Sequence, residues 1–499
     1  LAISSPVDSV WVNPKEFVAS AAELARLARL LELEPQALAR RVRQRSDREF
    51  LYIKRHLAPE LAEQVMALGL PGVALQREYR RFYPAGEVTA HVVGFTNIDD
   101  RGQEGIELAY NDWLQGEPGA KRVIKDRLGR IIDDVESLRE PRPGKALRLS
   151  IDRRLQYLAY RELKAAAAEQ GVRSASLVLL DVTTGEVLAM VNQPGYNPNN
   201  RLEINSQAAR NRAVTDAYEP GSTIKVFSVA AALEAGHFRP DSVIDTGPGY
   251  MRVGSYTIRD TRPFGKIDIS TLIQKSSNIG AAKMALALPP EAIWTMYARL
   301  GFGRPAGTGF PGEAAGLMPA RPPVRDAERA ALAYGYGLST TPLQLASAYA
   351  TIAADGVRRP VSFLALDQAP AGEQVMSAAV ARQVRTMMEA VVMKGGTAPQ
   401  AAVAGYRVAG KTGTARKAAA GGYAENAYLA YFAGFAPASR PRLAMVVMMD
   451  EPSERYYYGG RAAAPVFSRV MSGALRLLNV PPDDVPQLGA FVASAGGGR

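Results

Sequence analysis

Three short groups of residues have the types and the order that acyl transfer to a serine requires. The first is Ser222 with Lys225 three positions later, and the second is Ser276 with Asn278 two positions later. The third is a Lys-Thr-Gly-Thr run at 411–414. Each group alone is common by chance, but the ordered set is typical of enzymes that form a covalent acyl-serine intermediate.

Ser222 and Lys225 are the candidate nucleophile and base. Pro220 and Gly221 interrupt the chain before Ser222, and an apolar helical pattern follows over 224–233, so Ser222 is predicted at the N-terminal end of a helix. Residues three apart share a helix face, which brings the amine within reach of the hydroxyl. A lysine that is partly desolvated and close to another cation has a lowered pKa, and in its neutral form it can act as the base.

The third group is predicted to end a strand and to bind the substrate. Gly413 has no side chain that would block an extended peptide lying along the sheet edge. The backbone N–H groups of Ser222 and Thr414 would then form an oxyanion hole. The hydroxyls of Thr412 and Thr414 would bind a terminal carboxylate, and Lys411 would supply positive potential and help to keep the amine of Lys225 neutral.

The second group is predicted to complete the site. Ser276 would pass a proton between Lys225 and the leaving nitrogen, while the amide of Asn278 would orient an amide of the substrate.

Composition excludes several other kinds of site. The chain has no cysteine, which excludes disulfides, thiolate metal sites and a cysteine nucleophile. Its three histidines show no ligand spacing, so no metal is expected, and no Gly-x-Ser-x-Gly element is present. The net charge of +11 is spread without a dense basic run or a nucleic-acid motif, so no nucleic acid is expected as a partner. This charge would favour a position near an anionic membrane or glycan.

A length of 499 residues predicts more than one domain. The Pro- and Gly-rich segment 140–145 predicts a boundary, which leaves an amino-terminal domain over 1–145 and a second domain over 146–482. The first is expected to mix strands with an amphipathic helical stretch over 21–45. The Gly-rich end, 483–499, is predicted to be a flexible tail.

Strand patterns in the second domain come from its two ends. Two buried strands form a predicted hairpin, and three further strands follow late in the chain: 176–181, 186–191, 406–414, 428–435 and 443–449. Helical patterns, including 342–354, predominate between them, from 206 to 392. The sequence therefore predicts an α+β fold, in which an antiparallel sheet is covered by helices and carries an inserted helical subdomain.

These motifs closely resemble class B penicillin-binding proteins, and among them the division-specific FtsI type, penicillin-binding protein 3 of Gram-negative bacteria. The matching segments span nearly the whole chain: 82–84, 91–95, 105–108, 218–227, 275–278, 410–416, 458–460 and 463–467. The resemblance implies a penicilloyl-serine transferase fold with an amino-terminal mixed α/β pedestal domain.

The resemblance also implies an activity. A periplasmic D,D-transpeptidase of septal cell-wall synthesis would attack the D-Ala-D-Ala bond of a peptidoglycan stem peptide through Ser222. An amine of a neighbouring stem, expected to be that of meso-diaminopimelate, would accept the acyl group. β-Lactams would acylate Ser222, an FtsW-like glycan polymerase and other division proteins would be partners, and no cofactor is implied.

An upstream membrane anchor is expected as well. The chain opens at Leu1 without an initiator Met and has no apolar run of the roughly 20 residues that a bilayer requires, so we interpret it as a mature or truncated product. The resemblance places it on the periplasmic face of the inner membrane, held by a single helix before Leu1.

Five more residues are implied to line the substrate site: Arg416, Tyr334, Tyr428, Tyr457 and Tyr458. The last two belong to the segment 456–460, which follows the final strand and is predicted to be a loop at the sheet edge. Gly459 and Gly460 are expected to let this loop close around bulky β-lactam side chains.

Other functions fit part of the pattern. A β-lactamase of class A uses a Glu-x-x-x-Asn loop for deacylation, and no Asn lies between Asn278 and Lys411. A D,D-carboxypeptidase is the alternative enzyme, although the large amino-terminal domain disfavours it. A β-lactam sensor or a division scaffold is the alternative without catalysis.

Overall fold

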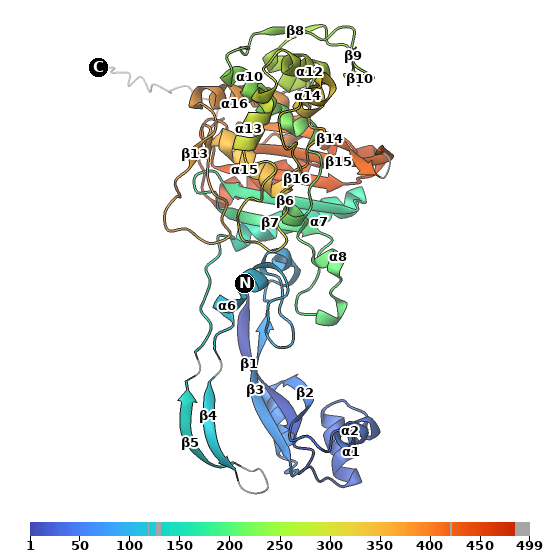
Figure 1. The fold of residues 1–499 in the computed structure, drawn as a ribbon, viewed down its shortest axis with the longest axis vertical. Coiled ribbons are helices and arrows are strands. Elements are labelled where there is room, and N and C mark those ends of the chain that lie inside the picture. Colours follow the sequence, from blue (N-terminus) through green and yellow to red (C-terminus); the bar gives the residue numbers. More distant parts are fainter. Residues whose placement is uncertain (118, 126–130, 141, 420–421, 485–499) are drawn as a thin grey trace, which may run out of the picture. The chain divides into compact units, whose positions relative to one another are not determined.

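The structure, a computed structural model, describes residues 1–117, 119–125, 131–140, 142–419 and 422–484 (Figure 1). Its contacts divide the chain into two compact units. The first comprises 1–86, 93–146 and 197–203, and the second comprises 87–92, 147–196 and 204–499. A single boundary at 145 would place 87–92 in the first unit and 197–203 in the second, and the structure has these two short segments the other way round. Of the predicted tail, 485–499 lie outside the described residues.

The first unit contains a three-stranded antiparallel sheet with helices beside it. Its strands in spatial order are β2 (Leu51–Leu57), β1 (Ile3–Val12) and β3 (Val73–Phe82). The helical stretch predicted over 21–45 is two helices, α1 (Ala21–Leu30) and α2 (Pro35–Arg43). Pro35 explains the break, because a proline disfavours helical backbone at the residue before it. The other elements assigned mainly to this unit are α3 (Pro59–Met66), α5 (Gly105–Ala109), α6 (Asn111–Leu114), β4 (Ala120–Lys125) and β5 (Ile131–Arg139).

The second unit is built on a five-stranded antiparallel sheet. Its spatial order is β14 (Ala409–Ala419), β15 (Gly422–Ala436), β16 (Leu443–Asp450), β6 (Ser174–Asp181) and β7 (Val187–Gln193). The prediction that strands from both ends of the domain meet in one sheet is confirmed. β14 begins three residues later than predicted, because Tyr406 turns back to pair with Val403 and its hydroxyl donates to the carbonyl of Val480 at 2.7 Å.

Helices cover both faces of this sheet. Every residue of β6 and β16 is buried, as expected of strands covered on both sides. The terminal helices α7 (Arg153–Gln170) and α18 (Ala464–Leu477) pack against each other and against the sheet, and α15 (Pro342–Ala353) packs against β6 and β16. Among the described residues, no helix is both long enough and apolar enough to cross a membrane.

A largely helical lobe is inserted between β7 and β14 (Figure 1). The helices of this stretch of chain are α8 (Ser206–Ala209), α9 (Arg212–Thr215), α10 (Lys225–Glu234), α11 (Ile269–Lys275), α12 (Asn278–Leu286), α13 (Glu291–Arg299), α14 (Asp326–Ala333), α15 and α16 (Ala378–Val392). Of these, α8 lies apart from the lobe, on the other side of the sheet (Figure 1). Short two-stranded ladders, which the sequence patterns did not predict, join some of them: β8 (Val243–Asp245) with β11 (Lys266–Asp268), β9 (Tyr250–Val253) with β10 (Tyr256–Arg259), and β12 (Val357–Arg358) with β13 (Glu373–Gln374). Helix α10 is buried from Lys225 to Leu233, so Lys225 of the first motif lies in the core, whereas Ser222 before the helix is half-buried.

Candidate active site

Ser222 lies in a short 3-10 turn, Gly221–Ile224, that leads directly into α10. The sequence predicted Ser222 at the first turn of the α-helix, whereas the structure has one 3-10 turn there before the α-helix begins. The turn is held from the other side of the site, because the Gly221 N–H donates to the carbonyl of Gly335 at 3.2 Å. A Cβ atom at Gly335 would lie 2.0 Å from the Gly221 carbonyl oxygen, so this close approach requires glycine.

The amine of Lys225 lies at the centre of the site. Its Nζ is 3.0 Å from the Oγ of Ser222 and 3.3 Å from the Oγ of Ser276. Two shorter contacts join it to oxygens that only accept hydrogen bonds, the Ser276 carbonyl at 2.6 Å and the Asn278 Oδ1 at 2.7 Å. A neutral amine has two N–H groups and one lone pair. With both hydrogens on these acceptors, the lone pair is left to face the hydroxyls, and the nearer hydroxyl is that of Ser222.

Burial favours this neutral form. Lys225 is fully buried, and desolvation lowers its pKa to about 7 while the nearby Asp260 carboxylate opposes the shift. Lys411 is also fully buried, and both burial and the charge of Lys225 lower its pKa. The two amines repel each other when charged, so protonation of one disfavours protonation of the other. The lowered pKa of Lys225 is due to burial, and the effect expected of Lys411 on Lys225 stays a prediction.

Asp260 is a residue that the sequence patterns missed. It follows β10, and its carboxylate accepts hydrogen bonds from the Ser277 Oγ at 2.6 Å and from the Asn278 N–H at 2.6 Å. Ser276 itself has a positive φ of 61°, a conformation uncommon outside glycine, at the junction of α11 and α12. Asp260 thus holds the turn that presents Ser276 and Asn278 to Lys225. No spacing relates it to the three motifs, so only the tertiary structure reveals it.

The Lys-Thr-Gly-Thr segment lies on β14, the edge strand of the sheet. The structure explains the glycine at position 413 by close packing within the protein, which differs from the expected role of leaving space for a substrate. A Cβ atom there would lie 2.8 Å from Thr223 Cγ2 and 2.9 Å from the Pro220 carbonyl oxygen. Gly413 therefore allows the turn with Ser222 to pack closely on the strand.

Thr397 is a second residue that the motifs do not include. Its hydroxyl is 2.9 Å from the hydroxyl of Thr412, and the carbonyl of Gly395, two residues earlier, accepts a 2.7 Å hydrogen bond from Lys275. Since Lys275 precedes Ser276, the loop over 393–397 joins the second motif to the third. We call it the bridging loop. The Thr414 hydroxyl accepts from the Gly459 N–H at 3.2 Å, which leaves its own hydrogen available.

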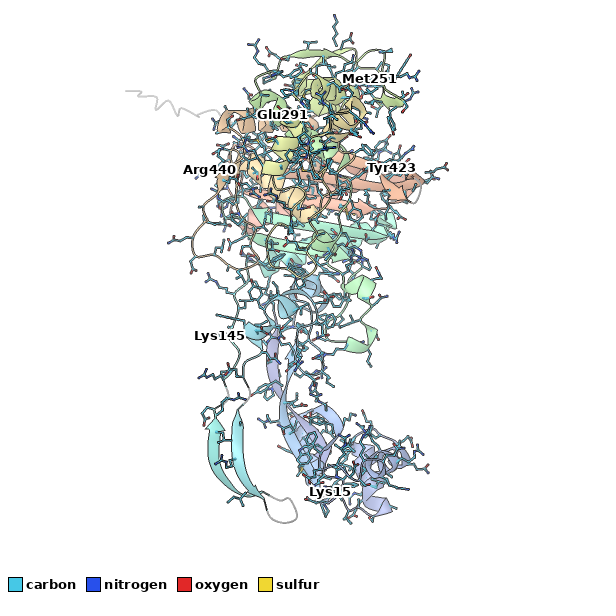
Figure 2. The ribbon with its side chains drawn as sticks, in the orientation of Figure 1. Lys15, Lys145, Met251, Glu291, Tyr423 and Arg440 are labelled. Carbon is cyan, nitrogen blue, oxygen red and sulfur yellow. The ribbon has the colours of Figure 1, made fainter. Side chains whose placement is uncertain are left out.

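The predicted tyrosines form two groups rather than one wall. The rings of Tyr428 and Tyr457 are 5.0 Å apart, and those of Tyr457 and Tyr458 are 4.1 Å apart. Tyr334 belongs to a second group, with Tyr336 at 5.6 Å and Tyr423 another 5.6 Å beyond it. The latter two were not predicted, and Figure 2 labels Tyr423 on β15 near the hairpin end. Arg416 is exposed and pairs with Tyr428 in the strand ladder.

The expectation that Gly459 and Gly460 let a loop close is wrong. Both are in the first turn of the short helix α17 (Gly459–Ala462), for which Tyr458 is the N-cap residue. A Cβ atom at Gly459 would lie 2.2 Å from the Tyr431 carbonyl oxygen, and one at Gly460 would lie 2.3 Å from the Thr397 carbonyl oxygen. The two glycines permit close packing of α17 on β15 and on the bridging loop.

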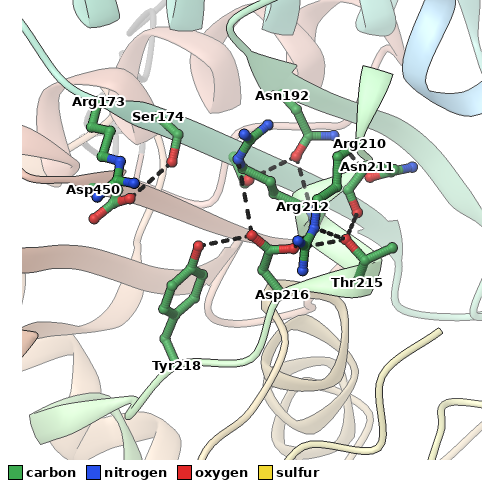
Figure 3. A network of polar contacts seen from close by, with 12 residues as sticks. Arg173, Ser174, Asn192, Arg210, Asn211, Arg212, Thr215, Asp216, Tyr218 and Asp450 are labelled. Carbon is green, nitrogen blue, oxygen red and sulfur yellow. Dashed lines mark hydrogen bonds and ion pairs between the residues drawn. The ribbon is translucent and has the colours of Figure 1, made fainter. Parts of the chain in front are cut away.

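A polar network supports the segment that leads to Ser222 (Figure 3). The Asp216 carboxylate binds Arg210 at 2.5 Å and accepts from the Tyr218 hydroxyl at 3.0 Å. Asn192 on β7 accepts from the Ala213 N–H at 2.9 Å, and this ties the segment to the sheet. Within the residues that the structure describes, no group of three or more histidine, aspartate or glutamate side chains is placed to hold a metal.

Two family models together match nearly the whole chain. The penicillin-binding protein transpeptidase domain matches residues 175–472, and the penicillin-binding protein dimerisation domain matches residues 1–149. The peptidoglycan D,D-transpeptidase FtsI of Escherichia coli K12 is 44% identical over 488 residues, 97% of this chain and 82% of that protein. This chain is a class B penicillin-binding protein of the FtsI type. Its activity is that of a serine-type peptidoglycan D,D-transpeptidase.

Further relatives and solved structures support this assignment to the penicillin-binding proteins. The probable peptidoglycan D,D-transpeptidase PenA of Neisseria gonorrhoeae is 43% identical over 97% of this chain and 83% of that protein. The transpeptidase domain of penicillin-binding protein 3 from Burkholderia pseudomallei has a TM-score of 0.63 at 43% identity, covering 69% of this chain and all of that one. Penicillin-binding protein 3 of Mycobacterium tuberculosis has a TM-score of 0.73 at 32% identity, covering 81% of this chain and 92% of that one. The catalytic fold is thus the expected penicilloyl-serine transferase fold.

Proposed function

We propose that Ser222 is the nucleophile of this transpeptidase and that Lys225 is its base. The observation that carries the proposal is the 3.0 Å contact between the Nζ of Lys225 and the Oγ of Ser222. The two shortest contacts of the amine, to Ser276 and Asn278, occupy its hydrogens and orient its lone pair toward that hydroxyl. The lowered pKa of Lys225 supports the assignment, because a base must be neutral to accept a proton.

Acylation then proceeds by proton transfer, nucleophilic attack and departure of the leaving group. Lys225 takes the hydroxyl proton as Ser222 Oγ attacks the carbonyl of the penultimate D-alanine of a stem peptide. The N–H groups of Ser222 and Thr414 stabilise the oxyanion. Ser276 passes the proton from Lys225 to the leaving nitrogen, the C–N bond breaks, and D-alanine departs.

Transfer reverses the roles. An amine of a second stem, which we propose to be that of meso-diaminopimelate, attacks the ester and gives up a proton. Ser222 recovers a proton as its C–O bond breaks.

The remaining predicted residues are proposed to bind the donor peptide or a β-lactam in its place. Asn278 would hold a substrate amide, with its side-chain amide kept in place by the Arg259 carbonyl at 3.0 Å. The carboxylate would lie between Lys411 and the hydroxyls of Thr412 and Thr414. Gly413, Arg416 and the four tyrosines would line the extended chain of the substrate or the side chain of an antibiotic: Tyr334, Tyr428, Tyr457 and Tyr458.

We further propose that chemistry is confined to 146–482 and that 1–145 is a non-catalytic pedestal. The match of the dimerisation-domain model to residues 1–149 supports this division. The FtsI type implies a single upstream helix that holds the enzyme on the periplasmic face of the inner membrane. An FtsW-like glycan polymerase and other division proteins are the partners that this assignment proposes.

Intact-mass spectrometry with benzylpenicillin tests the nucleophile. One adduct is expected on the protein, none on Ser222→Ala, and one on Ser472→Ala, a matched change on α18. A Ser222→Ala variant that still carries the adduct would refute the assignment.

The lifetime of the adduct separates a transpeptidase from a hydrolase. With no Glu-x-x-x-Asn loop to activate water, the acyl-enzyme should last at least about an hour, which corresponds to a barrier of about 22 kcal/mol. Rapid turnover of nitrocefin with release of free enzyme would support the β-lactamase alternative instead.

A further inference from the structure

A cleft of about 430 Å³ opens in the second unit, among residues that take no part in the three motifs. Its walls come from the end of α13, the start of α15 and the β12–β13 ladder. Figure 1 labels α13, α15 and β13. Small residues leave its volume free, among them Gly301, Ala306 and Gly372. Arg358 and Arg359 are the positively charged groups that line it.

These two neighbouring arginines are not fully bonded. In both, the Nε atom is buried, and it has no hydrogen-bond partner within the described parts of the chain. The Nη2 of Arg358 donates to Glu373 at 2.9 Å, whereas for Arg359 no side-chain hydrogen bond or ion pair is found among those residues. The Arg358 side chain is 37% exposed, so its guanidinium is open to a molecule from solvent. A guanidinium charge with no counter-ion beside it attracts an anion. Two guanidinium groups line one wall, and one of them has no carboxylate partner among the described residues, which indicates that an anion from outside the chain can bind there.

The charge around the cleft indicates the chemistry of that partner. Glu373 is the acidic side chain in its wall. Arg358 is the main cause of the lowered pKa of Glu373, and the charges of Arg299 and Arg304 add to it, so both lie nearby. Three guanidinium groups thus act on one carboxylate, while Arg359 lines the same cleft without a carboxylate partner among the described residues. An anion with two oxygens on one centre matches the fork of Arg359, whose N–H groups donate in parallel.

We propose that this cleft binds the oxyanion group of a small ligand, a carboxylate or a phosphate, with Arg359 as the principal contact and Arg358 beside it. Both kinds of group present paired oxygens of this geometry, so the chemistry is shared and the source differs. The site is separate from the acylation site and takes part in none of its steps. It gives the transpeptidase domain a second place at which an anionic molecule can bind.

Isothermal titration calorimetry on the whole chain tests the proposal, with inorganic phosphate and with glutarate as separate probes. Saturable binding of at least one probe is expected, and whichever probe binds more tightly identifies the source. Arg359→Gln should weaken this binding at least about tenfold. Arg382→Gln should leave it unchanged, because Arg382 lies outside the cleft and pairs with Asp355.

Acylation by benzylpenicillin provides the control for folding. Its rate should be the same in both variants and in the unmodified chain, since neither residue touches the motifs. The proposal is overturned if neither probe binds saturably at millimolar concentration. It is equally overturned if Arg359→Gln, acylating normally, binds the probe as tightly as the unmodified chain.

Discussion

Lys225 and Asp260 both bind Asn278: Lys225 contacts the Asn278 side chain, and Asp260 contacts the Asn278 backbone. The Asn278 Oδ1 lies 2.7 Å from the amine of Lys225, and the N–H donates to the Asp260 carboxylate at 2.6 Å. The same carboxylate raises the pKa of Lys225 against the effect of burial. One acidic residue thus influences both the geometry of the site and the protonation of Lys225.

The acylation rate should depend on pH through Lys225. Below its pKa of about 7 the amine is protonated and has no lone pair for the Ser222 proton, and above it the base is free. The second-order rate of acylation by benzylpenicillin should therefore rise through neutral pH and level off on the alkaline side. Stopped-flow measurements between about pH 5.5 and 8.5 check this. A rate independent of pH in that range would exclude Lys225 as the base.

Replacing Asp260 should change both the rate and its pH profile. In Asp260→Asn the carboxylate that raises the pKa of Lys225 is lost, so the midpoint of the profile should move to lower pH. The plateau should fall about tenfold or more, because hydrogen bonds to a charged group contribute roughly 1.5–3 kcal/mol. Asp326→Asn, at an exposed position of α14, is the control. A lower plateau with an unmoved midpoint would mean that Asp260 acts on geometry alone.

Thr397 should affect the binding of the substrate carboxylate. Thr397→Val keeps the shape of the side chain but removes the hydroxyl that lies 2.9 Å from that of Thr412. Loss of one neutral hydrogen bond, roughly 0.5–1.5 kcal/mol, should weaken the initial complex with benzylpenicillin about two- to tenfold. The acylation rate constant at saturation should change little, and Thr397→Ser should restore binding. If serine fails to restore it, the hydroxyl contact does not explain the effect.

The aromatic group of Tyr428, Tyr457 and Tyr458 should discriminate among antibiotics. Tyr457→Ala removes the ring in contact with both others and should slow acylation by bulky gem-dimethyl cephalosporins roughly 5- to 30-fold, as loss of ~1–2 kcal/mol implies. Small penicillins should be less affected. Tyr456→Ala is the control, because the hydroxyl of Tyr456 binds Glu169 on α7 instead. Equal slowing with every β-lactam would indicate a structural effect.

The features of the fold and site that depend on local sequence patterns could be predicted from the sequence. Ser222 and Lys225 lie three positions apart in one continuous turn and helix, so their contact follows from helix geometry alone. The buried strands β6 and β7 were evident from uninterrupted apolar runs. The break between α1 and α2 could also have been found, since Pro35 marks it.

What the sequence did not show depends on contacts between distant segments. Asp260 approaches Asn278 from the β9–β10 ladder, whose strands are four residues long, too short for a pattern to reveal. Thr397 contacts Thr412 where α17 and the bridging loop pack closely at Gly460, a contact between segments that no local pattern relates. Gly459 was interpreted as flexible because glycine permits both freedom and close packing, and only the neighbouring atoms distinguish the two.

The tight seating of α17 has a consequence for inhibitors. Gly459 and Gly460 allow α17 to pack against its neighbours without a gap, so the backbone at Tyr458 is held in one position. The space beside the Tyr458 ring is therefore fixed before an inhibitor binds. If inhibitors bind beside Tyr458, as we propose, each compound must fit the space that this backbone leaves, since close packing gives the backbone little room to move. Resistance at this place should therefore arise by exchanging ring side chains for smaller or differently shaped ones, and a drug that relies on backbone contacts alone would be indifferent to such exchanges.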